Sequence, residues 1–410
     1  MNERVIFVLP GKERSGGADN VLHYASELAS QFGYETFITS LTTSGNFTTE
    51  FGNSFKELTI SDAQKQDFAI AVGTHWSTME LALSLQSLHV LHFAQSIEDR
   101  FLGPSHFIKQ QQILAAQTLV DSISLAPWMS EELATLSGLK STVVLNQFFD
   151  VPMRDDQISN SIPLVVVEGS WSWYKGWPEA VQILMYVKEP IQIALVSSDG
   201  FLPEKAIRVL RRKFPSNRIS RFDRLSHADF LALLRRADVL LKTSCVEGSP
   251  LPHGEALASG CIVISTPVTG VELSVLHGKT GLIGEFHDAK GTAALIDLAI
   301  RDQELNMELR EQGLAWVRKT SRSNTSVEQF AKVIGKKLME PPQIKKLANF
   351  DLHEAWIRYA EINFGFQIRS RISQLILRLG QSYAFRPVAR AIRNTSFGKF
   401  IRRGLRVPER

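Results

Sequence analysis

Residues 239–265 read VLLKTSCVEGSPLPHGEALASGCIVIS, and the order of apolar and polar residues in this stretch decides the fold class. The apolar run 239–241 predicts a short strand, the segment around Glu255 predicts a helix, and the apolar run 262–265 predicts a second strand. Strands that are apolar throughout are typical of a parallel sheet covered on both faces. The stretch therefore predicts one strand–helix–strand unit of such a sheet.

The same alternation extends outward over most of the chain. Apolar strands separated by helices are expected in two series, at 4–9, 35–40, 68–72, 90–93, 120–124 and 142–145, and then at 164–167, 191–196, 219–222, 239–241 and 262–265. A polar stretch separates the two series. We therefore predict an α/β protein with two Rossmann-like, doubly wound domains that face a cleft, with ligands outside the carboxyl ends of the strands.

Four segments are expected in the domain organisation. They are an N-terminal domain (1–150), a linker (151–162), a C-terminal domain with closing helices (163–340) and a basic, amphipathic, helical tail (341–410). Residues 343–410 carry fourteen basic and four acidic side chains, a net charge of +10, whereas the other residues hold 32 basic and 38 acidic side chains, a net charge of −6. This contrast predicts either a tail that contacts an anionic membrane surface or an appendage packed on the body. Nucleic acid ranks behind both as a partner, because no recognition motif accompanies the arginines.

The composition is that of a globular protein in a reducing compartment. Of the 410 residues 44% are hydrophobic and 21% are charged. The two cysteines, Cys245 and Cys261, are expected to be buried free thiols. No secretory signal and no apolar run long enough for a membrane span are predicted. We therefore expect a cytoplasmic protein, with peripheral contact on the inner face of the membrane as an option for the tail.

The segment 245–260 carries the most chemistry. Glu247 follows a strand and should lie at the carboxyl edge of the sheet. Ser249 is a suitable N-cap, Pro250 fits the first helical position, and Gly260 can end the helix in the left-handed region. Glu255 is then expected about two turns into the helix. The N–H groups at a helix start suit phosphate, and a nearby carboxylate suits vicinal hydroxyls, so the segment predicts a nucleotide-diphosphate site.

The pattern EG-x-P-L-P-x-x-EALA-x-G at 247–260 resembles the E-x7-E signature of retaining glycosyltransferases, and family four of those enzymes in particular. Residues 267–282 and 169–176 (GSWSWYKG) are similar to two further elements of that family, and the likeness extends over roughly 4–338. The resemblance implies the GT-B fold, with the nucleotide-sugar donor in the C-terminal domain and the acceptor presented by the N-terminal domain. It also implies a catalytic Glu247, a ribose-binding Glu255 and a diphosphate-binding Lys175.

The resemblance implies further donor contacts and has two departures. Gly16 and Gly17 would let the N-terminal loop approach the donor, and the backbone N–H groups of Ser249, Leu251 and His253 would bind phosphate. Ser170 stands where the family usually has an arginine, so one phosphate counter-charge is missing or comes from elsewhere, with Arg224 and Lys242 as candidate substitutes. Pro250 and Pro252 remove two N–H donors from the helix start.

Two segments of the N-terminal domain are candidates for the acceptor side. Residues 89–103 (HVLHFAQSIEDRFLG) resemble a stretch of some bacterial surface-polysaccharide glycosyltransferases, which implies that His92, Gln95 and Glu98 line the cleft. The alternative is a loop whose polar groups cap helices. His75 follows the expected strand 68–72 and is predicted as a catalytic cleft residue, with a helix-cap role as the competing explanation.

The sequence as a whole favours a retaining, hexosyltransferase-type enzyme. It would move a sugar from a nucleotide-diphosphate sugar to a hydroxyl of a glycan or lipid-linked glycan, in polysaccharide biosynthesis. No aspartate-x-aspartate constellation is found, so neither a metal nor another cofactor is expected. A nucleotide-sugar epimerase of the same fold and a catalytically silent binding subunit stay open as alternatives.

Overall fold

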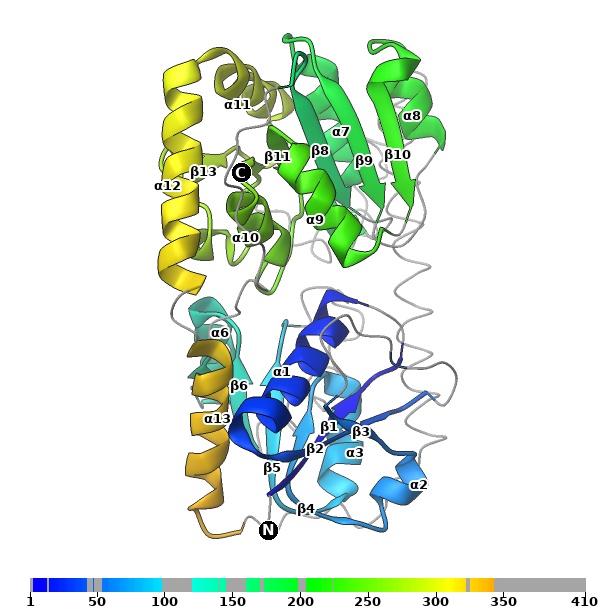
Figure 1. Ribbon diagram of the computed structural model, residues 1–410, viewed down its shortest axis with the longest axis vertical. Coiled ribbons are helices and arrows are strands. Elements are labelled where there is room, and N and C mark those ends of the chain that lie inside the picture. Colours follow the sequence, from blue (N-terminus) through cyan, green and yellow to red (C-terminus); the bar gives the residue numbers. More distant parts are fainter. Residues whose placement is uncertain are drawn as a thin grey trace, which may run out of the picture. The chain divides into compact units, whose positions relative to one another are not determined.

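A computed structural model describes residues 3–12, 15–42, 47, 54–97, 120–138, 140–144, 160–169, 173–197, 204–223, 225–321 and 325–342. The chain divides into two compact units, one made of 1–144 with the residues from 327 onward and the other of 145–326. Each unit is built on a parallel sheet flanked by helices (Figure 1). The predicted α/β class with two doubly wound sheets is therefore confirmed. The tail from 343 onward, and with it the prediction of an amphipathic helix there, lies outside the described residues.

The first sheet places its most buried strand, β1, near the centre. Its strands are, in spatial order, β3 (Lys56–Glu57), β2 (Glu35–Ser40), β1 (Arg4–Leu9), β4 (Asp67–Gly73), β5 (Gln86–Ala94), β6 (Asp121–Ser124) and β7 (Thr142–Val143). The helices of this unit are α1 (Gly16–Phe32), α2 (Ile60–Ala63), α3 (Met79–Ser84), α6 (Pro127–Ser137) and α13 (Thr325–Leu338). The strand order reverses direction between β1 and β4, and such a switch point is where ligands bind in open α/β sheets.

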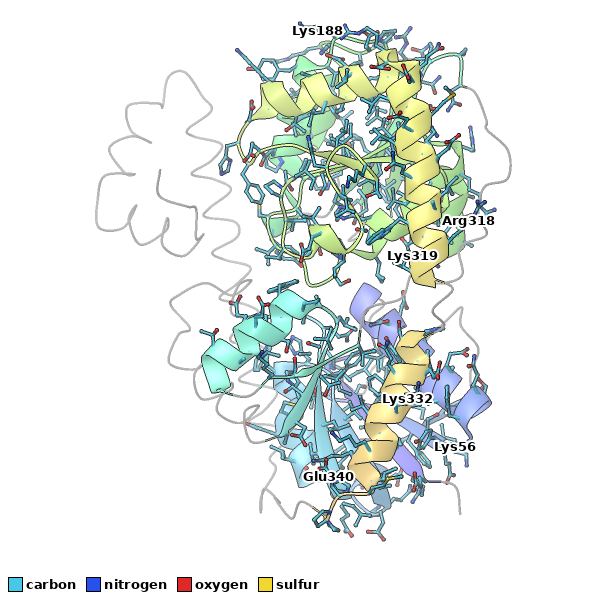
Figure 2. The ribbon with its side chains drawn as sticks, turned by 90° about the vertical axis from the view of Figure 1, so that its left-hand side faces the viewer. Lys56, Lys188, Arg318, Lys319, Lys332 and Glu340 are labelled. Carbon is cyan, nitrogen blue, oxygen red and sulfur yellow. The ribbon has the colours of Figure 1, made fainter. Side chains whose placement is uncertain are left out.

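Helix α13 packs in the first unit, although it comes last in the described chain. The Phe330 ring lies 4.9 Å from the ring of Tyr24, 5.1 Å from that of Phe93 and 6.0 Å from that of Phe7, measured between centroids. Glu340, which follows the helix in Figure 2, accepts a hydrogen bond of 2.7 Å from Lys337. We had grouped 325–338 with the C-terminal domain. Amphipathic spacing shows that a helix covers a sheet, but it carries no information on which sheet.

The second sheet has the same kind of order. Its strands are β10 (Ile219–Asp223), β9 (Gln192–Ser197), β8 (Leu164–Gly169), β11 (Val239–Lys242), β12 (Ile262–Ser265) and β13 (Gly281–Ile283). Its helices are α7 (Trp177–Tyr186), α8 (Glu204–Leu210), α9 (His227–Arg236), α10 (Leu251–Ala258), α11 (Ala289–Arg301) and α12 (Gln303–Ser321). Every pairing is parallel, and the order reverses direction between β8 and β11.

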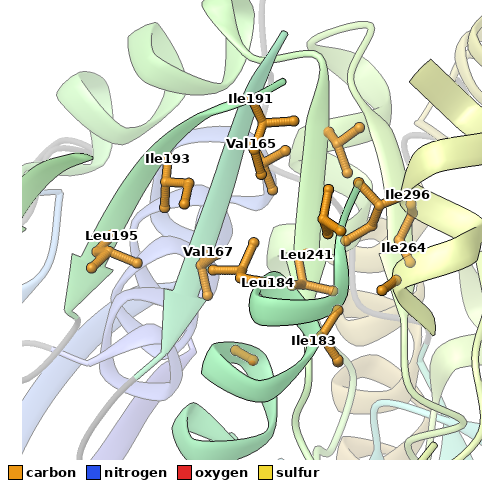
Figure 3. Packing of buried hydrophobic residues seen from close by; sticks show 14 of the residues in the cluster. Val165, Val167, Ile183, Leu184, Ile191, Ile193, Leu195, Leu241, Ile264 and Ile296 are labelled. Atoms are coloured by element: carbon orange, nitrogen blue, oxygen red, sulfur yellow. The ribbon is translucent and has the colours of Figure 1, made fainter. Parts of the chain in front are cut away.

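Both faces of the second sheet are packed, which explains its apolar strands. Val167 and Leu241 belong to a core that includes Ile183 and Ile296 from the helices on that face (Figure 3). Their strand neighbours, such as Leu240, join a second core with the helices of the other face. Fully burying each such side chain stabilises the fold by about 1.5–3 kcal/mol. Among the described helices, none combines the length and the apolar character that a membrane crossing requires.

Candidate functional site

Two charged side chains end neighbouring strands at the switch point of the second sheet. Leu241 of β11 pairs with Val167 of β8, so that Lys242 and Glu168 come next on the two strands. Because side chains alternate between the faces of a sheet, this pair lies on the face opposite to Val167 and Leu241. The Lys242 ammonium donates a hydrogen bond to Glu168 Oε2, and the Lys242 side chain is fully buried. The strand ends thus carry a buried ion pair.

Glu247 joins this pair to Lys175. The carboxylate oxygen Oε1 of Glu247 lies 2.8 Å from Lys175 Nζ and 3.2 Å from Lys242 Nζ. We call Glu168, Lys175, Lys242 and Glu247 the charge cluster. It contains two carboxylates and two ammonium groups, so its formal charges balance. The exposed fractions of the two lysine side chains differ, at 20% for Lys175 and 0% for Lys242, so Lys175 is the lysine that a ligand can reach.

The cluster keeps Glu247 and Lys175 ionised. Burial alone would raise the pKa of the Glu247 carboxyl, but the ammonium groups of Lys175 and Lys242 hold it well below its ordinary range. Burial alone would lower the pKa of Lys175, but the carboxylates of Glu247 and Glu168 raise it above its ordinary value. Charge pairing outweighs desolvation at both groups, and the site therefore holds fixed charges at neutral pH.

A tight turn positions Lys175. Gly176 has a φ of 68°, and a Cβ at this position would lie 1.8 Å from the carbonyl oxygen of Thr243. The Thr243 hydroxyl donates to the Gly176 carbonyl at 3.0 Å, and the Cys245 N–H donates to the Tyr174 carbonyl at 2.6 Å. Only glycine permits this close approach, because the left-handed backbone and the contact with Thr243 both exclude a side chain. The turn holds Lys175 against the loop that carries Glu247.

Helix α10 begins one residue later than predicted. Pro250 is the N-cap and Leu251 is the first helical residue, with no side chain capping the helix. Ser249 is therefore not the N-cap, and Pro250 is not the first helical residue. Gly260 ends the segment with a φ of 71°, in the left-handed region as predicted. Pro250 and Pro252 are tolerated there, because the first N–H groups of a helix have no partner within it.

Glu255 is the fifth residue of α10 rather than two turns in, and it is buried, with 3% exposed. Its Oε1 lies 2.8 Å from Nε2 of His227, at the start of α9. The backbone N–H of His253, which we had considered for phosphate, donates to the Pro250 carbonyl at 3.2 Å instead. The Leu251 N–H, in the first turn of α10, stays a candidate donor.

Two features of this region escaped the sequence analysis. Glu168 lies near the end of an apolar strand. The signal that could have revealed the ion pair was the presence of opposite charges in two otherwise apolar strands, at Glu168 and Lys242. His253 is fully buried, and neither of its ring nitrogens has a hydrogen-bond partner among the described residues. Burial and the ammonium of Lys242 lower the pKa of His253 to about 3. Burial, with the carboxylates of Glu179 and Glu247 nearby, raises the pKa of the Cys245 thiol to about 12, so this free cysteine stays a neutral thiol.

Two neutral imidazoles lie at the carboxyl edge of the first sheet among the described residues. His75 follows β4, and its Nδ1 accepts a hydrogen bond from the Ser77 N–H at 3.3 Å, as the cap of a short 3₁₀ helix. His92 lies on β5, with its Nδ1 3.4 Å from the Ser122 hydroxyl. Burial and the neighbouring His92 lower the pKa of His75 to about 3, and burial lowers that of His92 to about 4. The cap role proposed for His75 is observed, and its catalytic role stays a prediction.

Gly16, Gly17 and Gln95 are the remaining candidate residues that the structure describes in the first unit. Gly16 and Gly17 open helix α1 instead of lying in a loop, and the Ser15 hydroxyl caps this helix by accepting from the Ala18 N–H at 3.1 Å. The Asn20 side-chain amide donates to Gln95 Oε1 at 3.0 Å.

Three residues discussed above, Glu98, Ser170 and Arg224, lie outside the described residues. Within the described part of the chain, no group of three His, Cys, Asp or Glu side chains is arranged to hold a metal ion.

Comparison with known proteins finds a family that is similar to part of the chain. Residues 159–316 match the family model of the group 1 glycosyl transferases. A 98-residue stretch, 24% of the chain, is 33% identical to N-acetyl-alpha-D-glucosaminyl L-malate synthase from Bacillus anthracis and spans 26% of that relative. A 125-residue stretch, 30% of the chain, is 29% identical to D-inositol 3-phosphate glycosyltransferase from Corynebacterium glutamicum. It spans 27% of that protein, so the chain covers only about a quarter of either curated relative.

Solved structures extend the likeness over both units. HepE from Anabaena, crystallised with UDP-glucose, shares the fold with a TM-score of 0.67 and 14% identity, over 81% of this chain and 99% of HepE. The two-sheet architecture and the family match over 159–316 support the same assignment. The chain has the fold of the GT-B glycosyltransferases, and its residues 159–316 match the family model of the group 1 glycosyl transferases.

Proposed function

We propose that the protein is a retaining glycosyltransferase that moves a hexose from a nucleotide-diphosphate sugar to a hydroxyl of a glycan or lipid-linked glycan. One observation carries the proposal. An ionised Glu247 is held between two ammonium groups, in a loop that leads directly into the helix bearing a buried Glu255. Charge cluster and helix start together match what a pyrophosphate, a ribose and a reacting sugar require.

Each part of this site has a proposed role. The Lys175 ammonium compensates the charge that builds on the leaving diphosphate, because it is the more exposed of the two lysines. The start of α10 adds the Leu251 N–H and the partial positive charge of the helix N-terminus. Glu255 accepts hydrogen bonds from the ribose hydroxyls.

The same arrangement supports a same-face transfer. A leaving phosphate oxygen takes the proton of the incoming hydroxyl as the new glycosidic bond forms and the bond to the diphosphate breaks, so that the anomeric configuration is retained. Glu247 supports the positive charge that develops on the sugar. We propose that this chemistry needs no divalent metal, because Lys175 and α10 supply positive charge at the diphosphate.

Calorimetry tests the donor site. We expect UDP-glucose, UDP-N-acetylglucosamine, GDP-mannose or dTDP-rhamnose to bind the wild type, and Lys175→Ala and Glu255→Ala each to weaken that binding by about tenfold to a hundredfold, as for hydrogen bonds to charged groups. Glu204→Ala is the matched control, since Glu204 lies exposed on α8. Unchanged affinity in both site variants would contradict the assignment. For a uridine donor, Glu255→Ala should also abolish the preference for UDP over 2′-deoxy-UDP.

Product analysis tests the reaction class. With donor and acceptor, NMR of the product should show the anomeric configuration of the donor. With donor alone, an epimerised nucleotide sugar would identify the epimerase instead. Nucleotide binding without any nucleotide release in the presence of acceptors would identify a silent binding subunit.

We further propose that the acceptor belongs to polysaccharide biosynthesis at the inner face of the membrane. The net charge of +10 over 343–410 supports contact with anionic lipids, at about 1 kcal/mol for each cationic residue near the surface. Flotation with vesicles of phosphatidylglycerol should carry the protein, and vesicles of phosphatidylcholine should not. Equal behaviour with both would contradict membrane contact through charge.

A further inference from the structure

The charge cluster contains one lysine that a ligand cannot reach. Lys242 is fully buried at the end of β11, between the carboxylates of Glu168 and Glu247. Lys175, in contrast, has a 20% exposed side chain and contacts Glu247 alone among the cluster carboxylates within ion-pair distance. The two ammonium groups therefore share one carboxylate but differ in access.

Stability alone gives no reason for this arrangement. Placing two charges in a protein interior costs desolvation that their attraction repays only in part, and apolar residues of similar volume often serve stability as well or better. The Lys242–Glu168 pair ends two strands whose preceding residues are packed apolar side chains. A leucine and a methionine would extend that packing. The pair is thus better explained by its effect on Glu247.

We propose that Lys242 is a positioning residue that keeps Glu247 ionised and in place while Lys175 turns from Glu247 to the diphosphate of the donor. The inference rests on the proposed function, since it requires a nucleotide sugar at the site. A diphosphate carries two negative charges and competes with Glu247 for the exposed ammonium. Lys242 stays 3.2 Å from Glu247 Oε1 and cannot follow, because it is enclosed and also held by Glu168.

The charged and titratable groups that face Glu247 are few, which makes the proposal measurable. They are Lys175 from the 3₁₀ turn 173–175, Lys242 from β11, Glu168 from β8 behind the lysines, His253 from α10 and Cys245 from the loop itself. With pKa values of about 3 and about 12, His253 and Cys245 do not titrate between pH 5 and 7. Removing Lys242 together with Glu168 therefore leaves Glu247 as the only cluster carboxylate that takes up a proton in this range.

Calorimetry of nucleotide-sugar binding in buffers of different ionisation enthalpy counts the protons taken up. The probes are the four nucleotide sugars named above, whose diester phosphates do not titrate at pH 5–7. The double variant Glu168→Leu/Lys242→Met is expected to take up about one proton for each nucleotide sugar bound at pH 6. In this variant Glu247 loses its last cation when Lys175 turns to the diphosphate, and burial then raises its pKa by several units. Wild type and Lys213→Met are expected to take up close to none. Lys213 follows α8 and donates to the carbonyls of Leu184 and Met185 at the end of α7, so this variant is a lysine removal in the same unit away from the site.

Turnover gives a second, independent readout. The acid limb of the kcat profile reports the substrate complex and that of kcat/KM reports the free enzyme. In the double variant we expect the kcat limb to move up by roughly 1–3 pH units, and the kcat/KM limb to move less, because Lys175 still faces Glu247 in the free enzyme. The single variant Lys242→Arg keeps the positive charge beside Glu247 and should show the wild-type pH profile of kcat.

The outcomes separate this inference from the proposed function. Binding of none of the four nucleotide sugars by the wild type would contradict the donor site itself. Binding with equal proton uptake by wild type and double variant would overturn the role of Lys242 and leave the donor site standing. Loss of the folded state in the double variant, seen by circular dichroism, would also overturn it, because it would show that the pair serves stability.

Discussion

The switch points of the two sheets have the same backbone order but different side chains. In the first unit His75 follows β4 and His92 lies near the end of the neighbouring β5, and both imidazoles have pKa values far below neutral pH. Between β8 and β11 in the second unit, two carboxylates and two ammonium groups lie within ion-pair distance of one another. A doubly wound sheet shows where a ligand binds, and the side chains at its edge decide which ligand binds there.

The largest effect is expected from removing the charge of Glu247 at the second sheet edge. Glu247→Gln keeps the volume of the side chain but no longer supports positive charge at the reacting sugar. We expect kcat to fall by about 10²–10³-fold, as for the loss of one preorganised electrostatic group, while the affinity for the nucleotide sugar changes little. Initial rates of nucleotide release at saturating donor give the measurement.

Glu179→Gln is the control for this prediction. The Glu179 side chain is 12% exposed, against 13% for Glu247, and it lies in the same unit, where it accepts a hydrogen bond from the His287 N–H. A comparable loss of kcat in both variants would show that any change of buried charge in this unit suffices, and that Glu247 has no special place.

Sequence alone predicted the architecture of this edge, and the reasons are physical. Parallel strands such as 262–265 are covered on both faces, so they appear as apolar runs. Glu247 and Glu255 were found because they lie in one short segment with Pro and Gly at fixed positions. Lys242 was mentioned only as a substitute cation, and Glu168 was missed, because strand pairing brings them together across 74 residues.

The burial of side chains was harder to predict than the order of the elements. His253 lies in a helix of eight residues whose covered face depends on packing with α9 and α12, and so short a helix carries little periodic signal. Helix α13 was grouped with the wrong sheet because Phe330 contacts aromatic residues more than 200 positions earlier, among them Phe93. Local patterns predict elements, and long-range packing decides their partners.

A second prediction compares one glycine at each sheet edge. In Gly176→Ala the new Cβ would meet the Thr243 carbonyl at 1.8 Å on a backbone with positive φ. In Gly73→Ala it would meet the Met79 sulfur at 2.3 Å. A side chain can move where a backbone carbonyl cannot, so we expect Gly176→Ala to cost about 3 kcal/mol or more and Gly73→Ala about 1 kcal/mol.

Thermal unfolding followed by calorimetry measures both costs. The larger one corresponds to a fall in Tm of roughly 6–12 °C for a unit of this size. Equal falls in Tm in the two variants would mean that the turn holding Lys175 can shift to accommodate a side chain. The second sheet edge would then be no more rigid than the first.

The smallest effect concerns two buried histidines, His92 and His253, whose pKa values are low at both sheet edges. His92 and His253 are buried, with pKa values of about 4 and about 3, whereas an unfolded chain binds a proton at about 6.5. Each therefore contributes stability that is complete above pH 6.5 and is lost as the pH falls toward the folded-state pKa, by about 1 kcal/mol at pH 5.5. In His92→Gln and His253→Gln the fall in Tm between pH 7.5 and 5.5 should shrink by roughly 2–4 °C each. The two shifts should be equal, because both folded-state values lie below the range scanned. If either variant kept the wild-type dependence of Tm on pH, the imidazole that it replaces would be in contact with water in the folded protein. The two sheet edges would then differ in their histidines as well as in their carboxylates and lysines.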